Sequence, residues 1–310
     1  MAQITAALVK ELREKTSAGM MDCKKALNET NGDLEAAADW LRTKGIAKAD
    51  KKASRIAAEG LVAVALDGTT GALVEVNSET DFVARNDGFQ TAVSEVSKLA
   101  LAANSNEELA AATTASGDDV TEMFKKLVGK IGENMTFRRM AKLTVSDGVV
   151  AGYMHNAVTD GMGKIGVLVA LESAGDKAKL EDLAKKIAMH VAATNPLALS
   201  VDDLDPAVVQ KERDMLKAEA LESGKPEAIV DKMVEGRMQK FFKESVLLTQ
   251  IFVMDGERAI AKVIEDEAAA LGTDVKMTGY VRMGLGEGIE KKEEDFAAEV
   301  AATLKDSEKE

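Results

Sequence analysis

Two segments of the chain share a pattern that limits which folds it can adopt. In residues 61–77, two apolar or alternating runs flank the turn-forming stretch DGTTG, and residues 149–173 repeat this arrangement around a second glycine-rich connection. Such runs around a glycine-containing turn predict β-hairpins, and a helical pattern follows each one. The order predicts an α+β fold with two core subdomains, residues 59–144 and 145–284. They are expected to be either an internal duplication or two unrelated hairpin-helix units.

Residues 1–45 contain three short helical patterns, which predict a compact module of the ubiquitin-associated type. The second pattern places Met20, Cys23 and Leu27 on one face, so these side chains are expected to line the interior. It ends at Asn31-Gly32, where glycine can adopt the left-handed conformation that closes a helix.

The third helix is expected to begin after Asp33, whose carboxylate can accept hydrogen bonds from the free N–H groups of the first turn. It is expected to stop at Lys44-Gly45. Residues 46–58 carry several basic side chains and no apolar stripe. They predict a basic linker or a short exposed helix.

Two charged helical patterns, residues 206–223 and 226–242, flank a Gly-Lys-Pro turn. Glycine ends the first helix and proline starts the second, so residues 205–242 predict a protruding antiparallel hairpin within the second core subdomain. The remaining residues, 285–310, predict a C-terminal helical module, because Phe296, Val300 and Leu304 recur at fourfold spacing.

The composition argues against several classes of protein. With 53 acidic and 40 basic residues, the formal net charge is -13, which opposes broad nucleic-acid binding. No apolar run approaches the roughly 20 residues that cross a bilayer, so we expect no membrane association. A single cysteine and the lack of a signal-like start favour the cytoplasm.

Catalytic groups are scarce in this sequence. Cys23 lies on an apolar stripe, which indicates a buried structural thiol rather than a nucleophile. His190 falls among helical apolar positions, and neither it nor His155 belongs to a cluster with metal-ligand spacing. We expect no enzymatic activity, no metal and no cofactor. A hydrolase or transferase site around His155 and Asp160 is the remote alternative.

One glycine pattern imitates a nucleotide-binding motif. Gly161, Gly163 and Gly166 satisfy G-x-G-x-x-G, but the last glycine leads into a strand-like run instead of opening a helix. A hairpin turn explains the pattern better. No G-x-x-x-x-G-K-[ST] loop occurs, so we expect no direct nucleotide binding.

The most distinctive passage is SETDFVARNDGFQ, residues 78–90, where Thr80 and Asp81 are expected to cap a helix that Phe82 begins. Together with other stretches in the same order, it resembles the elongation factor Ts family. These stretches are VKELREKTSAGMMDCKKAL, GKIGENMTFRR, KIAMHVAA, MVEGRM and EGIEKKEEDFAAEVAA. The chain departs from the family pattern in the TTASGDDVTEMF region, around residues 159–163 and in VLLTQIFVMD.

The resemblance implies a guanine-nucleotide exchange factor that binds elongation factor Tu in its GDP-bound and nucleotide-free forms. It implies that Asp81 and Phe82, within residues 80–83 (Thr80 to Val83), disturb the magnesium site of the partner. The other partner-binding residues that it implies are Arg13, Met20, Met21, Lys24, Ile131, Gly132 and His155. A scaffold or chaperone that binds ubiquitin-like folds through the N-terminal module, without promoting exchange, is the alternative.

Overall fold

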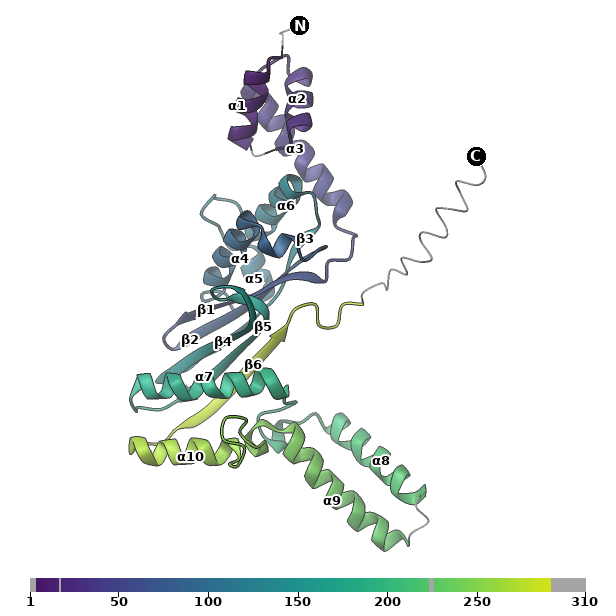
Figure 1. The fold of residues 1–310 in the computed structure, drawn as a ribbon, viewed down its shortest axis with the longest axis vertical. Helices are drawn as coiled ribbons and strands as arrows, with labels where there is room; N and C mark the ends of the chain where they lie inside the picture. The colour runs from purple at the N-terminus through teal and green to yellow at the C-terminus, as the bar shows by residue number, and fades with distance from the viewer. Residues whose placement is uncertain (1–3, 17, 223–225, 291–310) are drawn as a thin grey trace.

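The structure is a computed structural model that describes residues 4–16, 18–222 and 226–290. It combines an antiparallel sheet with helices, as the predicted α+β class requires. In Figure 1 the N-terminal helices lie at one end of an elongated molecule, the sheet lies in the middle, and a pair of long helices projects at the other end.

All strand pairs of the sheet are antiparallel, and its order is β3-β2-β1-β5-β4, with β6 also beside β5. The strands are β1 (Glu59–Asp67), β2 (Thr70–Ser78), β3 (Met135–Thr144), β4 (Gly148–Thr159), β5 (Met162–Glu172) and β6 (Lys276–Gly284). The hairpins β1–β2 and β4–β5 are each followed by helices and then by a third strand that pairs with the second strand of the hairpin. This recurrence is the order that a duplication would produce.

Helices cover each half of the sheet. The first half packs against α4 (Asp87–Leu99), α5 (Asn106–Ala110) and α6 (Val120–Ile131), and the second half packs against α7 (Lys177–Thr194) and α10 (Ile260–Leu271). The opposite faces of the two halves meet in a third cluster that includes Val62, Leu73, Val150 and Leu168. Strands covered on both faces need long apolar runs, which explains the composition of both hairpins.

Two glycines occupy matching places where the two hairpins begin. Gly60 has φ +122°, and a Cβ there would lie 2.2 Å from the Val76 carbonyl oxygen. Gly148 has φ +150°, and a Cβ there would lie 2.0 Å from the Leu171 carbonyl oxygen. Only glycine fits either position without moving the partner strand.

The N-terminal module consists of α1 (Ala6–Thr16), α2 (Met20–Glu29) and α3 (Leu34–Lys52) around a small core that includes Cys23 and Leu27. Asp33 caps α3 as predicted, since its carboxylate accepts hydrogen bonds of 2.9 Å from two backbone N–H groups of the first turn. The expectation that Met20 faces the interior is wrong, because its side chain is 60% exposed.

The predicted end of α3 at Lys44-Gly45 is also wrong, because the helix continues to Lys52. Gly45 faces Gly129 of α6, and a Cβ on Gly129 would lie 3.0 Å from the Gly45 Cα. Glycine therefore allows two helices to cross closely, and their packing offsets the roughly 1 kcal/mol that glycine costs inside a helix. Part of the segment expected to form a linker is consequently helical.

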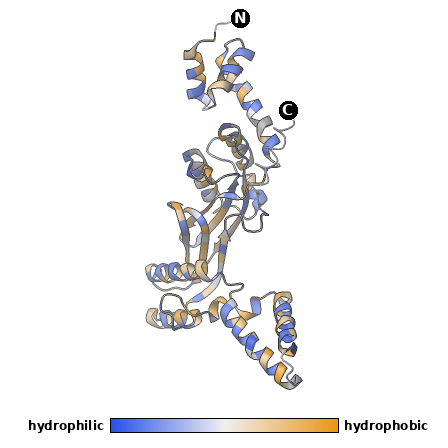
Figure 2. Cartoon of the chain, turned by 45° about the vertical axis from the view of Figure 1, so that its right-hand side comes forward, coloured by the Kyte–Doolittle hydropathy of each residue, from blue (hydrophilic) through white to orange (hydrophobic). Residues whose placement is uncertain are grey.

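The projecting pair is α8 (Pro206–Glu222) and α9 (Glu227–Ser245), which lie side by side (Figure 1). Apolar side chains, among them Leu216 and Met238, are buried between them. Arg237 and Glu219 form an ion pair of 2.7 Å across the pair. Blue and orange residues alternate along both helices in Figure 2, as expected of helices with one apolar face. Three short 3₁₀ helices complete the elements of the described residues: Val83–Arg85, Val201–Asp203 and Leu247–Thr249.

Two predicted features lie outside the described residues. These are the Gly224-Lys225 part of the turn between α8 and α9, and the C-terminal helical pattern that contains Phe296, Val300 and Leu304.

Candidate functional site

The turn between β2 and α4 displays an aromatic side chain. Phe82 is 79% exposed, whereas its neighbour Val83 is buried in the core of the first half. Asp81 is exposed beside Phe82. Single exposed apolar side chains are common on protein surfaces. Among the described residues, however, Phe82 is the most exposed large hydrophobic side chain and the only aromatic one that is exposed, which makes this turn a candidate surface for a partner.

The expectation that Thr80 and Asp81 cap a helix is wrong. Asn86 caps α4 instead, and its side-chain oxygen accepts a 3.1 Å hydrogen bond from the Phe89 N–H. The Thr80 hydroxyl donates to Glu133, 53 positions away, at 2.8 Å. Phe82 precedes a short 3₁₀ helix without a side-chain cap.

Two of the predicted contact segments lie side by side. Ile131 ends α6, and Gly132 closes the helix with φ +91°. Glu133 follows directly, and its carboxylate also accepts a 2.9 Å hydrogen bond from the Thr80 backbone N–H. The fold therefore brings residues 131–132 next to residues 80–83.

His155 lies on β4, in the other half of the sheet, opposite Ile165. Its side chain is exposed, and its Nδ1 lies 3.2 Å from the Tyr153 hydroxyl. The structure thus places His155 on a different half of the core from Phe82.

The predicted contact residues of the N-terminal module lie on its surface. Arg13 on α1 and Lys24 on α2 are exposed, and Met21 is 75% exposed. Together with the exposed Met20, they present apolar and basic groups at one end of the molecule. This end of the molecule is separate from the Phe82 turn.

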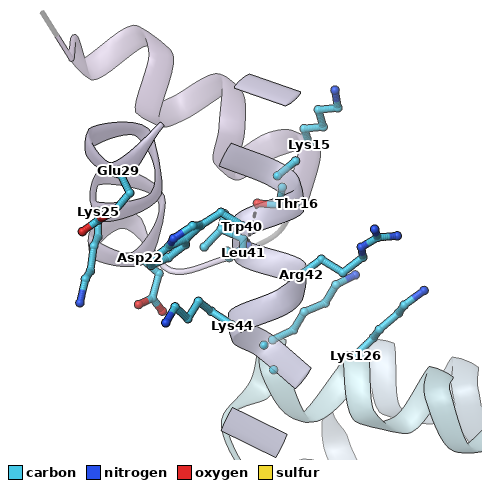
Figure 3. A pocket seen from close by; sticks show the side chains of 15 residues that line it. Lys15, Thr16, Asp22, Lys25, Glu29, Trp40, Leu41, Arg42, Lys44 and Lys126 are labelled. Atoms are coloured by element: carbon cyan, nitrogen blue, oxygen red, sulfur yellow. Dashed lines mark hydrogen bonds between the residues drawn. The ribbon is translucent and has the colours of Figure 1, made fainter. Parts of the chain in front are cut away.

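A cavity of about 510 Å³ lies where the N-terminal module meets α6. Figure 3 shows Trp40 and Lys44 on one side of α3 and Arg42 with Lys126 on the other. The Lys44 ammonium lies 5.5 Å from the centre of the Trp40 ring, and Lys126 pairs with Asp118 at 2.6 Å. These side chains diverge, so the cavity lacks the convergent polar groups that a small-molecule site requires.

The residues weighed as catalytic candidates have structural surroundings. The Cys23 thiol is buried and lies 3.7 Å from the Ala18 carbonyl oxygen. His190 is buried, and its Nδ1 accepts a 3.3 Å hydrogen bond from the Val253 N–H while Nε2 lies 2.8 Å from Gln250 Oε1. Burial lowers the pKa of His190, which the Gln250 hydrogen bond only partly offsets.

The glycine motif that imitates a nucleotide site lies in the β4–β5 hairpin, as predicted from its context. Gly161 occupies the turn with φ +68°, and Gly163 and Gly166 belong to β5. Across residues 4–16, 18–222 and 226–290, no cluster of histidine, cysteine and acidic side chains could hold a metal ion. No helix in this part of the chain is long and apolar enough to span a membrane.

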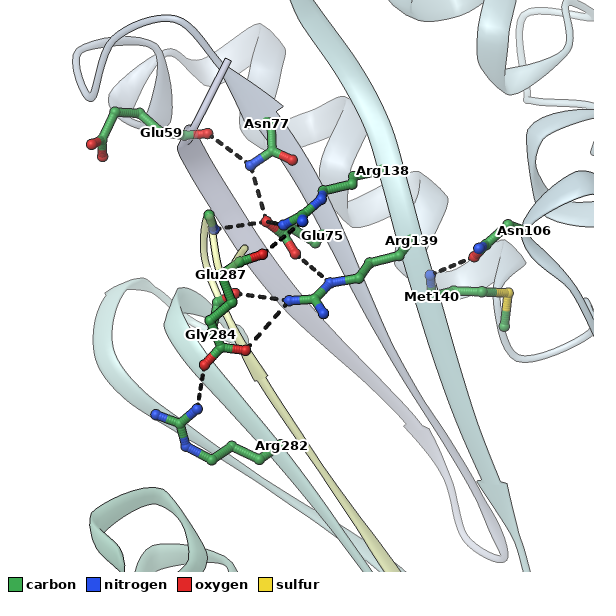
Figure 4. Close-up of polar contacts among 11 residues, drawn as sticks. Glu59, Glu75, Asn77, Asn106, Arg138, Arg139, Met140, Arg282, Gly284 and Glu287 are labelled. Atoms are coloured by element: carbon green, nitrogen blue, oxygen red, sulfur yellow. Dashed lines mark hydrogen bonds and ion pairs between the residues drawn. The ribbon is translucent and has the colours of Figure 1, made fainter. Parts of the chain in front are cut away.

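Sequence reasoning missed the polar network at the end of β6 (Figure 4). Glu75 on β2 is fully buried and contacts Arg138 and Arg139 of β3. The signal was available: one acidic residue interrupts an apolar run, and two adjacent arginines follow in GENMTFRR. Glu79 and Glu133, which frame the Phe82 turn, were missed as well.

Known proteins resemble this chain over almost its whole length. A family model described as elongation factor TS matches residues 79–287, the region that carries the Phe82 turn, strands β3 to β6 and the projecting helices. A relative from Rhodospirillum centenum, named elongation factor Ts, is 59% identical over 304 residues, covering 97% of this chain and 99% of the relative. Another of the same name, from Rhizobium etli (strain CIAT 652), is 56% identical over 307 residues, covering 98% of this chain and all of the relative. The chain therefore belongs to the elongation factor Ts family.

Proposed function

We propose that this protein acts in translation as a guanine-nucleotide exchange factor that binds elongation factor Tu in its GDP-bound form and promotes release of GDP. GTP then binds the empty partner, and the exchange factor leaves. In this role the chain catalyses no covalent chemistry and binds no nucleotide itself. Because translation takes place there, we assign its action to the cytoplasm.

The observation that carries the proposal is the display of Phe82 beside Asp81. We propose that the ring enters the GTPase domain of the partner while the Asp81 carboxylate perturbs the surroundings of the bound Mg²⁺. A side chain that is 79% exposed in the free protein can gain most of its burial energy in the complex.

Magnitudes indicate that Phe82 does not act alone. Each tenfold gain in release rate needs about 1.36 kcal/mol, so a thousandfold gain needs about 4 kcal/mol. Full burial of a phenylalanine contributes about 1.5 to 3 kcal/mol. Further contacts must therefore supply binding energy and hold the ring in place.

We assign these further contacts to the surfaces that the family resemblance suggests. Arg13, Met20, Met21 and Lys24 would anchor the partner at the N-terminal end. Ile131 and Gly132 lie next to the Phe82 turn, and His155 would reach the partner from the second half of the core. By linkage, the protein must bind nucleotide-bound partner more weakly than empty partner, by the factor with which it weakens nucleotide binding.

The test follows release of a fluorescent GDP analogue from elongation factor Tu after addition of excess unlabelled GTP. Sub-stoichiometric amounts of this protein are expected to accelerate the signal loss strongly. Phe82→Ala is expected to retain much of the binding and to slow exchange. Binding without any acceleration by the folded wild-type protein would contradict the proposal and favour a scaffold or chaperone.

A further inference from the structure

Two segments of the chain hold one another through a reciprocal pair of carboxylates. Glu133 accepts hydrogen bonds from the Thr80 backbone N–H through Oε2 at 2.9 Å and from the Thr80 hydroxyl through Oε1 at 2.8 Å. Glu79, which precedes Thr80, accepts from the backbone N–H of Asn134, which follows Glu133. The Glu133 carboxylate thus binds the backbone of the segment that carries Glu79, and the Glu79 carboxylate binds the backbone of the segment that carries Glu133.

The pair is anchored to a third segment before β1. Arg55 places a guanidinium nitrogen 3.3 Å from Glu79 Oε2, and the Arg55 carbonyl oxygen accepts a 2.8 Å hydrogen bond from the Asn134 side chain. Asn134 is buried, as is Ser78, whose hydroxyl donates to the Thr80 carbonyl oxygen at 2.8 Å. Hydrogen bonds to ionised carboxylates are among the stronger ones in proteins, so the segments form a rigid unit.

This unit adjoins the displayed aromatic side chain. Because the Phe82 ring is 79% exposed, packing of the ring itself does little to fix its direction. The far side of the turn is held by buried Val83 and by a 3.1 Å hydrogen bond from the Arg85 N–H to the Phe82 carbonyl oxygen. On the near side, Thr80 is held by Glu133.

We propose that Glu79 and Glu133 are positioning residues for nucleotide exchange, a role that rests on the function proposed above. They fix the turn so that Phe82 and Asp81 meet the partner in one direction, without themselves touching the nucleotide site. If the turn were mobile, ordering it in the complex would consume part of the binding energy of the ring. The same contacts set residues 131–132 and residues 80–83 at a constant separation.

The test compares Glu133→Ala and Glu133→Gln in the exchange assay over a range of concentrations of this protein. Glu133→Ala removes both acceptors and is expected to lower the maximal exchange rate about tenfold, which corresponds to about 1.4 kcal/mol. The concentration that gives half of the maximal rate is expected to change less than twofold. Glu133→Gln keeps one acceptor oxygen and most of the side-chain volume, so a smaller loss is expected from a variant that folds.

Glu122→Gln, at the opposite end of α6, is the matched control and should exchange at the wild-type rate. A double-mutant cycle separates positioning from a general loss of structure. In a Phe82→Ala background, Glu133→Ala should cause a smaller loss than in the wild-type background, because only Asp81 is left to position. The inference would be overturned if the fold-losses in exchange rate of Phe82→Ala and Glu133→Ala simply multiply in the double variant. Unchanged maximal rates in both Glu133 variants would also overturn it, while the exchange function stands. Absence of exchange by the wild-type protein would overturn both.

Discussion

Glu75 Oε2 accepts a 2.6 Å hydrogen bond from Arg139 Nε, within a network that ties the first half of the core to the end of the second (Figure 4). Glu75 Oε1 accepts three further hydrogen bonds: 2.9 Å from Arg138, 3.0 Å from Asn77 and 2.8 Å from the Gly286 N–H. Gly286 follows β6, whereas the side chains belong to β2 and β3. One carboxylate therefore links the two halves of the core. This link adds to the pairing of β1 with β5, which extends over only a short stretch.

Removing this charge is expected to destabilise the fold. Glu75→Gln keeps the shape but removes the carboxylate that pairs with Arg138 and, among the described residues, leaves Arg139 only Glu287, 3.5 Å away. We therefore expect the free energy of unfolding to fall by about 3 kcal/mol. Urea unfolding measures the change, with the exposed Glu257→Gln as control. A Glu75 variant as stable as the control would show that the network contributes no net stability.

Mild acid is expected to destabilise the protein through His190. Burial lowers the pKa of this histidine in the folded state, so between about pH 6.5 and the folded pKa the unfolded chain binds more protons. The stabilisation is present above about pH 6.5 and is lost as the pH falls through the folded pKa. Urea unfolding from pH 7.5 to 5 should show this loss in wild type.

The two histidines of the chain provide a matched comparison for this effect. His155→Gln keeps His190 and should retain the wild-type dependence on pH. His190→Gln should lower stability at pH 7.5 but flatten the dependence between pH 7.5 and 5. If the free energy of unfolding falls equally steeply with pH in all three proteins, the acid sensitivity belongs to other groups.

Glycine to alanine should act in opposite directions at two sites. At Gly148, the new Cβ would lie 2.0 Å from a backbone oxygen, so we expect a loss of about 3 kcal/mol. At Gly236 in α9, no neighbouring atom of the described residues lies within 4 Å of the position that a Cβ would take, so we expect a gain of about 0.5 to 1 kcal/mol. Thermal unfolding of both variants measures the difference. A Gly148 variant as stable as wild type would show that the strands can separate locally without cost.

Local patterns predicted those parts of the fold that depend on neighbouring residues. Both hairpins follow from apolar runs around turns such as the one at Gly68, and the cap at Asp33 follows from its own side chain. The continuation of α3 through Gly45 was missed because the reason for it, Gly129, lies on a distant helix.

The candidate site also has features that the sequence indicates and features that depend on contacts between distant residues. The resemblance singled out Phe82, and the structure adds that its ring is displayed. Glu79 contacts a residue 55 positions away in the sequence, and Glu133 contacts one 53 positions away, so no local pattern could indicate these contacts. Met20 was assigned to the interior because its spacing matches that of Cys23 and Leu27, but it lies in the first turn of α2, where it remains exposed.

Partner binding and folding should depend on different methionines. Met21 is 75% exposed, so Met21→Ala is expected to leave the unfolding temperature unchanged. If it contacts elongation factor Tu, the lost apolar burial should raise the half-saturating concentration in the exchange assay severalfold, equivalent to about 1 kcal/mol. Met283→Ala is the control, because this buried side chain lies between the halves of the core and its loss should cost about 2 to 5 kcal/mol of stability. If the Met21 variant reaches half of its maximal exchange rate at the wild-type concentration, Met21 does not contribute to the interface.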